Sequence, residues 1–116
     1  MPPPSQLSIA TSTLNRLVKE EASYHKELEQ QQASIAKLEQ GGGDENAEYV
    51  LRQERKAVEE TKAIFPQLKQ KIQDSLAKLE QQLEQDKGPG DQSTPEQITK
   101  AKEAVAAALT AIREIS

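Results

Sequence analysis

Apolar residues recur along most of this chain at alternating steps of three and four, the spacing that puts side chains on one face of an α-helix. The first such segment predicts a helix over residues 12–40, after a flexible N-terminus at 1–8. Two of its face positions are polar, and polar residues in such a seam fix the register or lie at a wet edge. The predicted face consists of Leu14, Leu17, Glu21, Tyr24, Leu28, Gln31, Ile35 and Leu38, with Val18 beside it.

The second segment, residues 44–87, contains a proline where a helix would ordinarily exclude one. An interior proline removes a backbone hydrogen bond and clashes with the preceding turn, which costs about 3 kcal/mol. Two independent helices would usually reset the apolar phase, but here the phase is kept on both sides. We therefore predict one helix bent at Pro66. The seven-residue repeat runs through Leu51, Val58, Phe65, Ile72 and Leu79.

The second apolar flank of this segment changes sides at the proline, which predicts a different helix partner for each half. Before Pro66 the flank is Val50, Ala57 and Ile64, and after it the flank is Leu76 and Leu83. A third helix is predicted over 95–115, where Thr94 and Gln97 form a capping-box pattern around Pro95 at the first helical position. Its predicted face consists of Ile98, Ala101, Val105, Ala108, Ile112 and Ile115, flanked by Leu109.

The glycine-rich stretches at 40–46 and 86–97 are short connections, and short connections make neighbouring helices antiparallel. At 1.5 Å per residue the three helices would be roughly 42, 66 and 31 Å long. The first would then lie along 44–72 and the third along about 64–87, so that all three overlap only around 64–72. The expected fold is all-α: an elongated antiparallel three-helix bundle with left-handed coiled-coil-like packing, as a single domain over 1–116.

Composition agrees with narrow apolar seams between long helices. Hydrophobic residues make up only 34% of the 116 residues, and the net charge is −4. The basic and acidic residues are interleaved, which argues against a nucleic-acid footprint. No apolar stretch approaches the length needed to span a membrane. The chain has no cysteine, which removes disulfides, thiolate metal sites and a cysteine nucleophile.

Candidate chemistry is sparse. His25 and Glu21 lie one helical turn apart and could share a metal ion, but such a site needs three or four ligands. Gly41–Gly43 lack the lysine and hydroxyl residue that complete a phosphate-binding loop. The acidic residues are scattered over helix surfaces, without the apolar pocket that acid–base catalysis needs. We expect no enzyme activity, no cofactor and no metal.

Charged residues cover the outer side of the first predicted helix. This face is either simply solvated or a docking surface for a partner of mixed charge. Its residues are Arg16, Lys19, Glu20, Lys26 and Glu27.

The stretch "RLVKEEASYHKE" from Arg16 to Glu27 resembles the first helix of the tubulin-binding cofactor A family. The likeness continues through "GDENAEYVLRQERKAVEETKAIFPQL", where Pro66 matches a mid-helix proline of the family, and it covers roughly residues 9–84. The resemblance implies a small monomeric three-helix protein of the cytoplasm, without nucleotide or metal. It also implies that the chain holds quasi-native β-tubulin and passes it toward the αβ heterodimer, with other tubulin-folding cofactors as further candidate partners.

Two structural alternatives share the helical pattern. A spectrin-like repeat is one, although the chain has no tryptophan for its first helix. A subunit of a coiled-coil assembly, such as a prefoldin-like one, is the other, although "GGGDEN" is too short for hairpin strands. A monomer that captures β-tubulin would favour the chaperone, and a stable homo-oligomer without capture would favour the alternatives.

Overall fold

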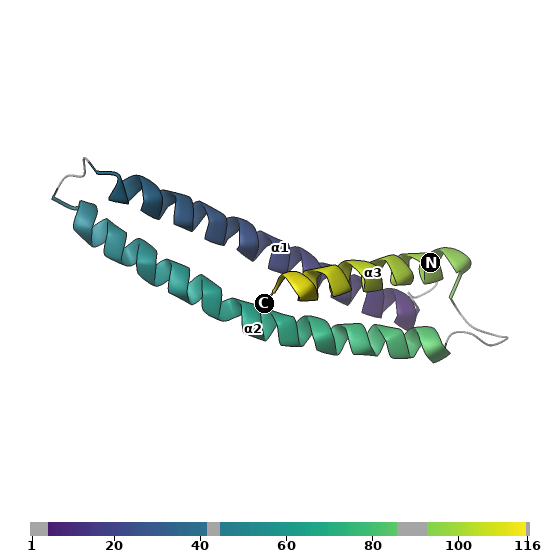
Figure 1. Cartoon of the computed structure of the whole chain (residues 1–116). Coiled ribbons are helices and arrows are strands. Elements are labelled where there is room, and N and C mark those ends of the chain that lie inside the picture. The colour runs from purple at the N-terminus through teal and green to yellow at the C-terminus, as the bar shows by residue number, and fades with distance from the viewer. Residues whose placement is uncertain (1–4, 42–44, 86–92, 116) are drawn as a thin grey trace.

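The computed structural model of the chain describes residues 5–41, 45–85 and 93–115. Three helices account for nearly all of them: α1 (Gln6–Glu39), α2 (Ala47–Gln85) and α3 (Pro95–Glu114). They form an elongated bundle with extents of 70 × 29 × 16 Å, in which α2 runs antiparallel to both α1 and α3 (Figure 1). The prediction of an all-α helical bundle is confirmed.

The first helix begins at Gln6, so the predicted start at residue 12 is wrong. The predicted flexible segment at 1–8 is wrong for residues 5–8, which form the cap and the first turn of the helix. The cause is a side-chain cap. The Ser5 hydroxyl accepts a hydrogen bond from the backbone N–H of Ser8 at 3.1 Å, which satisfies one of the donors that a helix start leaves unpaired. Residues 1–4 lie outside the described part of the chain.

Hydroxyl-bearing residues in the first turns of α1 make the start of this helix hard to predict from the sequence. Thr11 and Thr13 donate their hydroxyls to the carbonyls of Leu7 and Ile9, at 2.8 and 3.0 Å, so their polar groups are satisfied within the helix itself. Leu7 is fully buried seven residues before the equally buried Leu14, so the apolar repeat of α1 extends to its first turn.

The second helix is continuous through its proline, as predicted. α2 contains Pro66 within 39 helical residues and no non-helical linker around it. Figure 1 shows α2 changing direction near its middle. Pro66 has no N–H to donate to the carbonyl of Lys62, and its ring pushes against the preceding turn, which is the usual cause of such a bend. The predicted start at 44 is too early, because residues 45 and 46 form a turn before Ala47, and the predicted end at 87 lies outside the described residues.

Replacing Pro66 with Ala should change stability far less than it would in an isolated helix. There the substitution would add about 3 kcal/mol, because a donor is restored and the ring clash is removed. Here α1 and α3 pack against the bent form of α2, so we expect a much smaller gain, or a loss, in urea unfolding. A gain of the full amount would mean that the bend is not held by packing.

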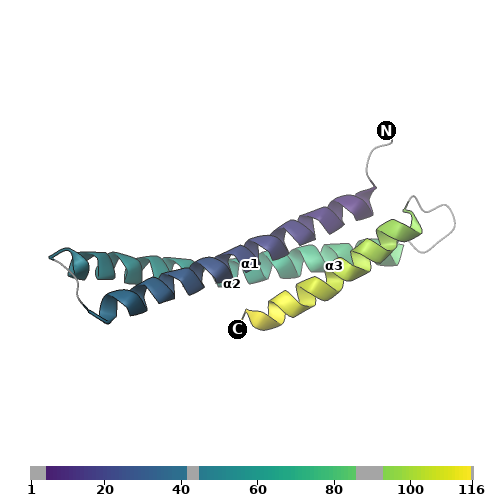
Figure 2. The same ribbon diagram turned by 90° about the horizontal axis from the view of Figure 1, so that it is seen from above.

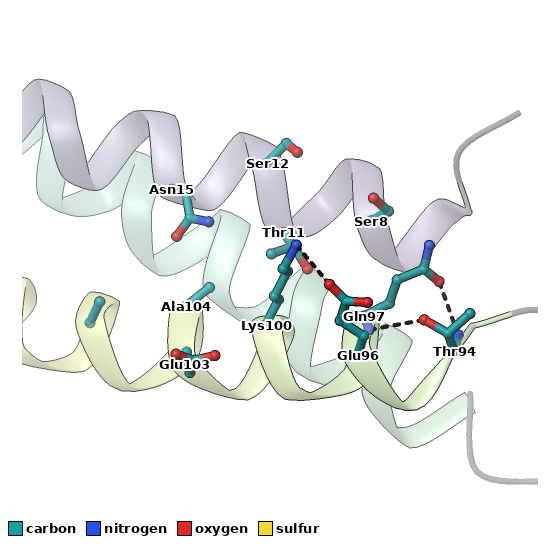
Figure 3. Close-up of a pocket in the computed structure, with 11 residues that line it drawn as sticks. Ser8, Thr11, Ser12, Asn15, Thr94, Glu96, Gln97, Lys100, Glu103 and Ala104 are labelled. Atoms are coloured by element: carbon teal, nitrogen blue, oxygen red, sulfur yellow. Dashed lines mark hydrogen bonds and ion pairs between the residues drawn. The ribbon is translucent and has the colours of Figure 1, made fainter.

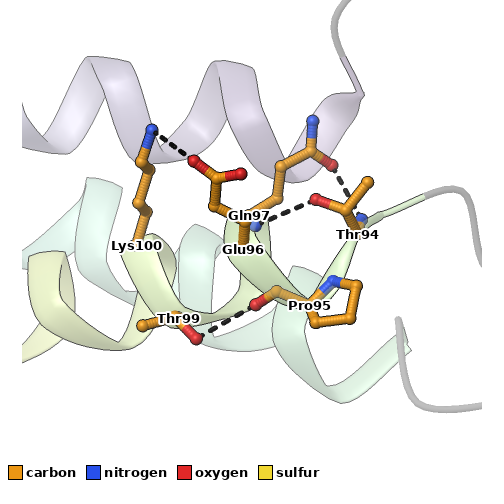
Figure 4. A network of polar contacts seen from close by, with 6 residues as sticks. All are labelled: Thr94, Pro95, Glu96, Gln97, Thr99 and Lys100. Carbon is orange, nitrogen blue, oxygen red and sulfur yellow. Dashed lines mark hydrogen bonds and ion pairs between the residues drawn. The ribbon is translucent and has the colours of Figure 1, made fainter.

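The third helix follows its predicted pattern closely. The Thr94 hydroxyl accepts from the N–H of Gln97, and the Gln97 side chain accepts from the N–H of Thr94, both at 3.1 Å (Figure 4). Pro95 occupies the first helical position, where its missing N–H costs nothing. Small residues let the neighbouring helices approach closely, and the buried alanines of α3 are Ala101, Ala104, Ala108 and Ala111.

The core divides the molecule into a three-helix body and a two-helix arm. In the body, α1 from Gln6 to about His25 packs with α3 and with α2 from Phe65 to about Leu83. Beyond the end of α3, α1 and α2 continue alone as the arm (Figures 1 and 2). The prediction that all three helices overlap only around 64–72 is wrong. Because α1 begins earlier than predicted, it lies beside α2 as far as Gln82, whose amide donates to the Gln6 side-chain oxygen at 3.4 Å.

Candidate partner interface

The outer face of α1 carries the five residues predicted to contact a partner, and all of them are exposed. Because they are spaced over three turns of one uninterrupted helix, their side chains are presented at fixed positions along the body. The face holds three positive and two negative side chains: Arg16, Lys19, Lys26, Glu20 and Glu27.

None of these five side chains forms an ion pair within the described residues, although ion pairs occur elsewhere on the surface. The Arg55 guanidinium lies 3.1 Å from the Glu39 carboxylate, and the Lys100 ammonium lies 3.4 Å from Glu96. The charges on the α1 face are therefore available to a partner without first breaking an internal contact.

A carboxylate and an imidazole pair in the seam of α1, close to the end of α3. Glu21 is only 3% exposed and its carboxylate pairs with Nε2 of His25, one turn later, whose side chain is 40% exposed. The imidazole also packs on the Phe65 ring of α2, with 4.6 Å between ring centroids. The polar seam position predicted at Glu21 is thus a buried carboxylate that reaches the surface only through its histidine.

Burial raises the pKa of the Glu21 carboxyl above its usual value of 4.5. Desolvation penalises the charged carboxylate, and the nearby Glu114 carboxylate of α3 adds to that penalty. His25 acts in the opposite direction through its charge and its hydrogen bond, but these effects are smaller. The pair is therefore a place where the body carries an unfavourable charge.

A polar groove runs between α1 and α3 near the start of both helices, with a volume of about 750 Å³ (Figure 3). Its polar groups are hydroxyls, amides, the carboxylates of Glu96 and Glu103, and the ammonium of Lys100, which pairs with Glu96 at 3.4 Å. The hydroxyl of Thr11 is already used by its own helix. No nucleophile–base pair is formed by the residues that line it: Ser8, Thr11, Ser12, Asn15, Thr94, Glu96, Gln97, Lys100, Glu103, Ala104 and Ala107.

A second, apolar groove of about 530 Å³ opens where α3 ends, and the sequence did not point to it. It is formed by His25 and Leu28 of α1, by the Pro66 bend of α2 and by the last residues of α3. The signal available in the sequence was the pair of lysines seven residues apart that bracket the proline. The full lining is His25, Leu28, Lys62, Phe65, Pro66, Lys69, Glu114 and Ile115.

Neither groove resembles a metal centre. Over residues 5–41, 45–85 and 93–115, no three or more His, Cys, Asp or Glu side chains gather closely enough to hold a metal ion. The helices of that same part of the chain include none that is long and apolar enough to cross a membrane. The described residues form an elongated bundle with exposed charged faces and two open grooves, which places the chain in the class of elongated helical-bundle proteins.

Known proteins share both the sequence and this architecture. The sequence model of the family "Tubulin binding cofactor A" matches residues 2–105. Tubulin-specific chaperone A of Saccharomyces cerevisiae is 37% identical over 102 residues, covering 86% of this chain and 93% of the yeast protein. Tubulin-folding cofactor A of Arabidopsis thaliana is 34% identical over 100 residues, covering 86% and 85%. The crystal structure of the Arabidopsis cofactor superposes with a TM-score of 0.75 at 32% identity, covering 90% of this chain and 92% of that one.

This chain belongs to the tubulin binding cofactor A family. The family predicted from the first helix and the Pro66 region is thereby confirmed. The match extends to residue 105, beyond the likeness noted over roughly residues 9–84, so it includes about half of α3.

Proposed function

We propose that this chain is a tubulin-folding chaperone that binds quasi-native β-tubulin and passes it toward the αβ-tubulin heterodimer. The observation that carries this proposal is the family match over residues 2–105, together with the likeness of the fold to the Arabidopsis cofactor. The unpaired charges on the α1 face support it, because they give a mixed-charge partner a fixed, exposed surface.

The proposal includes the setting in which the chain acts. We infer a monomer of the cytoplasm, working in the pathway that supplies microtubules and in contact with other tubulin-folding cofactors. The role is binding rather than catalysis. It requires no nucleotide and no metal, because a chaperone of this kind acts by holding a folded or nearly folded client on its surface.

Two measurements on the whole chain test the proposal. Sedimentation or light scattering gives the solution mass, and a pull-down with purified β-tubulin measures capture. A monomer of 12.8 kDa that captures β-tubulin supports the chaperone. A stable homo-oligomer that captures none would instead support a structural coiled-coil subunit.

Charge reversal on the α1 face should weaken this capture without unfolding the chain. We expect the triple variant Arg16→Glu, Lys19→Glu, Lys26→Glu to bind β-tubulin at least about tenfold more weakly at low salt, since tubulin is strongly acidic and like charges across an interface are unfavourable. Helicity should be unchanged, because lysine, arginine and glutamate have similar helix propensities. Circular dichroism and pull-down together measure both effects.

The matched control reverses three exposed lysines elsewhere: Lys56→Glu, Lys78→Glu and Lys102→Glu. It changes the net charge by the same amount and should bind nearly as well as the unsubstituted chain. The double variant Glu20→Lys, Glu27→Lys should not weaken capture. Equal capture by both triple variants would indicate that the α1 face is solvated and is not a docking surface.

A further inference from the structure

We infer that the apolar groove at the end of α3 is a second contact site for the client, and that it receives a large apolar side chain from a segment rich in carboxylates. This groove is bounded by all three helices: by His25 and Leu28 of α1, by Phe65 and Pro66 of α2, and by Glu114 of α3 with Ile115 directly after it. The inference rests on the proposed function and adds where and what the client contacts.

The floor of the groove is preorganised to accept an apolar side chain. The imidazole of His25 packs on the Phe65 ring at 4.6 Å and is held from below by the buried Glu21 carboxylate. Phe65 and Ile115 are fixed in the core, while Leu28 is only partly covered. A side chain that enters here would bury apolar surface without ordering the groove first.

Two lysines on the rim determine the charge of the occupant. Lys62 and Lys69 lie seven residues apart on α2, on either side of Pro66, and both line the groove. In the described part of the chain neither ammonium has an ion pair, and Glu114 is the acidic residue among the lining side chains. On a chain of net charge −4, this is a local excess of positive charge beside an apolar hollow. Carboxylates next to the inserted side chain would complement it.

The proline is part of the groove. Pro66 lies within α2 between Lys62 and Lys69, and all three residues line the groove. Figure 1 shows α2 changing direction near its middle, and α3 ends at Glu114, which lines the same groove. The groove therefore lies where surfaces of all three helices converge on Pro66.

The double variant Lys62→Glu, Lys69→Glu tests the site, with Lys56→Glu, Lys78→Glu as the matched control on the same helix. We expect the groove variant to bind purified β-tubulin about tenfold more weakly at low salt, and the difference to shrink as salt screens the charges. The control should bind like the unsubstituted chain. Equal binding by the two variants would overturn the groove assignment, whereas an unsubstituted chain that captures no β-tubulin would overturn the proposed function and the groove with it.

The absence of cysteine from the chain allows an independent test of position. Single variants Lys62→Cys and Lys69→Cys place one thiol at the groove, and Lys56→Cys and Lys78→Cys place one at exposed positions of the same helix that do not line the groove. Maleimide labelling of the chain, followed by its mass, should be slowed several-fold by β-tubulin only at the groove positions. Protection at all four positions, or at neither groove position, would contradict the assignment.

Discussion

Replacing Phe65 with Ala is expected to lower the free energy of unfolding by about 3–5 kcal/mol, as for other buried aromatic residues. Phe65 is 9% exposed and lies where the three helices meet, with His25 on one side and Ile115 on another. The substitution removes the ring contact with His25 and leaves a cavity that the long helices cannot close without moving together. Urea unfolding followed by circular dichroism measures the loss.

The position of Phe65 within the bundle, rather than its apolar character alone, determines this loss. Val58 is also buried, one heptad earlier, but only α1 and α2 meet in the arm. Val58→Ala should therefore cost less than Phe65→Ala. Similar, small losses for the two variants would show that the body is not the stable part of the molecule.

Two leucines of α1 give a control with the same chemical change. Leu14 has 0% exposure in the body, and Leu14→Ala should cost about 2–5 kcal/mol. Leu38 is half-buried in the arm, and Leu38→Ala should cost about 1 kcal/mol, near the average for single substitutions. A reversed order of these two losses would contradict the division into body and arm.

The course of α2 could be predicted because its apolar repeat is present on both sides of the proline. The repeat from Leu51 to Leu79 keeps its phase through Pro66, which requires helix on both sides of the proline. The start of α1 was missed for the opposite reason. Leu7 continues the repeat of Leu14, but the hydroxyl residues between them favour turns in isolation, and their bonds to helix carbonyls become evident only in the structure.

The candidate sites were harder to predict from the sequence, because they depend on where each helix ends relative to the other two. The exposed charges of the α1 face follow from helical spacing alone, yet spacing does not distinguish a docking surface from a solvated one. The groove at Pro66 exists because α3 ends beside the bend, and that coincidence is a tertiary property. The surroundings of Glu21 likewise involve remote residues, because Glu114 raises its pKa and its partner His25 packs on Phe65.

Glu21 is the position at which we expect a substitution to raise stability. It occupies the seven-residue repeat between Leu14 and Leu28, where every neighbouring position of the seam is apolar. We expect Glu21→Leu to raise the free energy of unfolding at pH 7 by about 1–3 kcal/mol, because it removes the desolvation cost of a buried carboxylate and buries an apolar side chain in its place. The His25 side chain is 40% exposed in the unsubstituted chain, and we expect it to keep its contact with Phe65 in the variant.

The pH dependence of this effect has a defined sign. Burial raises the pKa of Glu21 in the folded chain above the 4.5 of the unfolded chain, so the folded state binds this proton more tightly. The contribution of Glu21 is therefore most favourable below pH 4.5 and is lost as pH rises through the raised pKa. The advantage of Glu21→Leu over the unsubstituted chain should accordingly grow with pH across that range, as measured by urea unfolding at a series of pH values.

Two further variants separate charge from burial. Glu21→Gln removes the titrating group but adds no apolar surface, so it should abolish the pH-dependent part while giving less stability than leucine. Glu20→Leu makes the same change at an exposed neighbour and should stay within about 0.5 kcal/mol of the unsubstituted chain. A loss of stability in Glu21→Leu, with Glu20→Leu neutral, would mean that the ion pair with His25 outweighs the desolvation of the carboxylate. In that case the contact between Glu21 and His25 stabilises the bundle near the end of α3. The position of His25 in the groove would then depend on the Glu21 carboxylate.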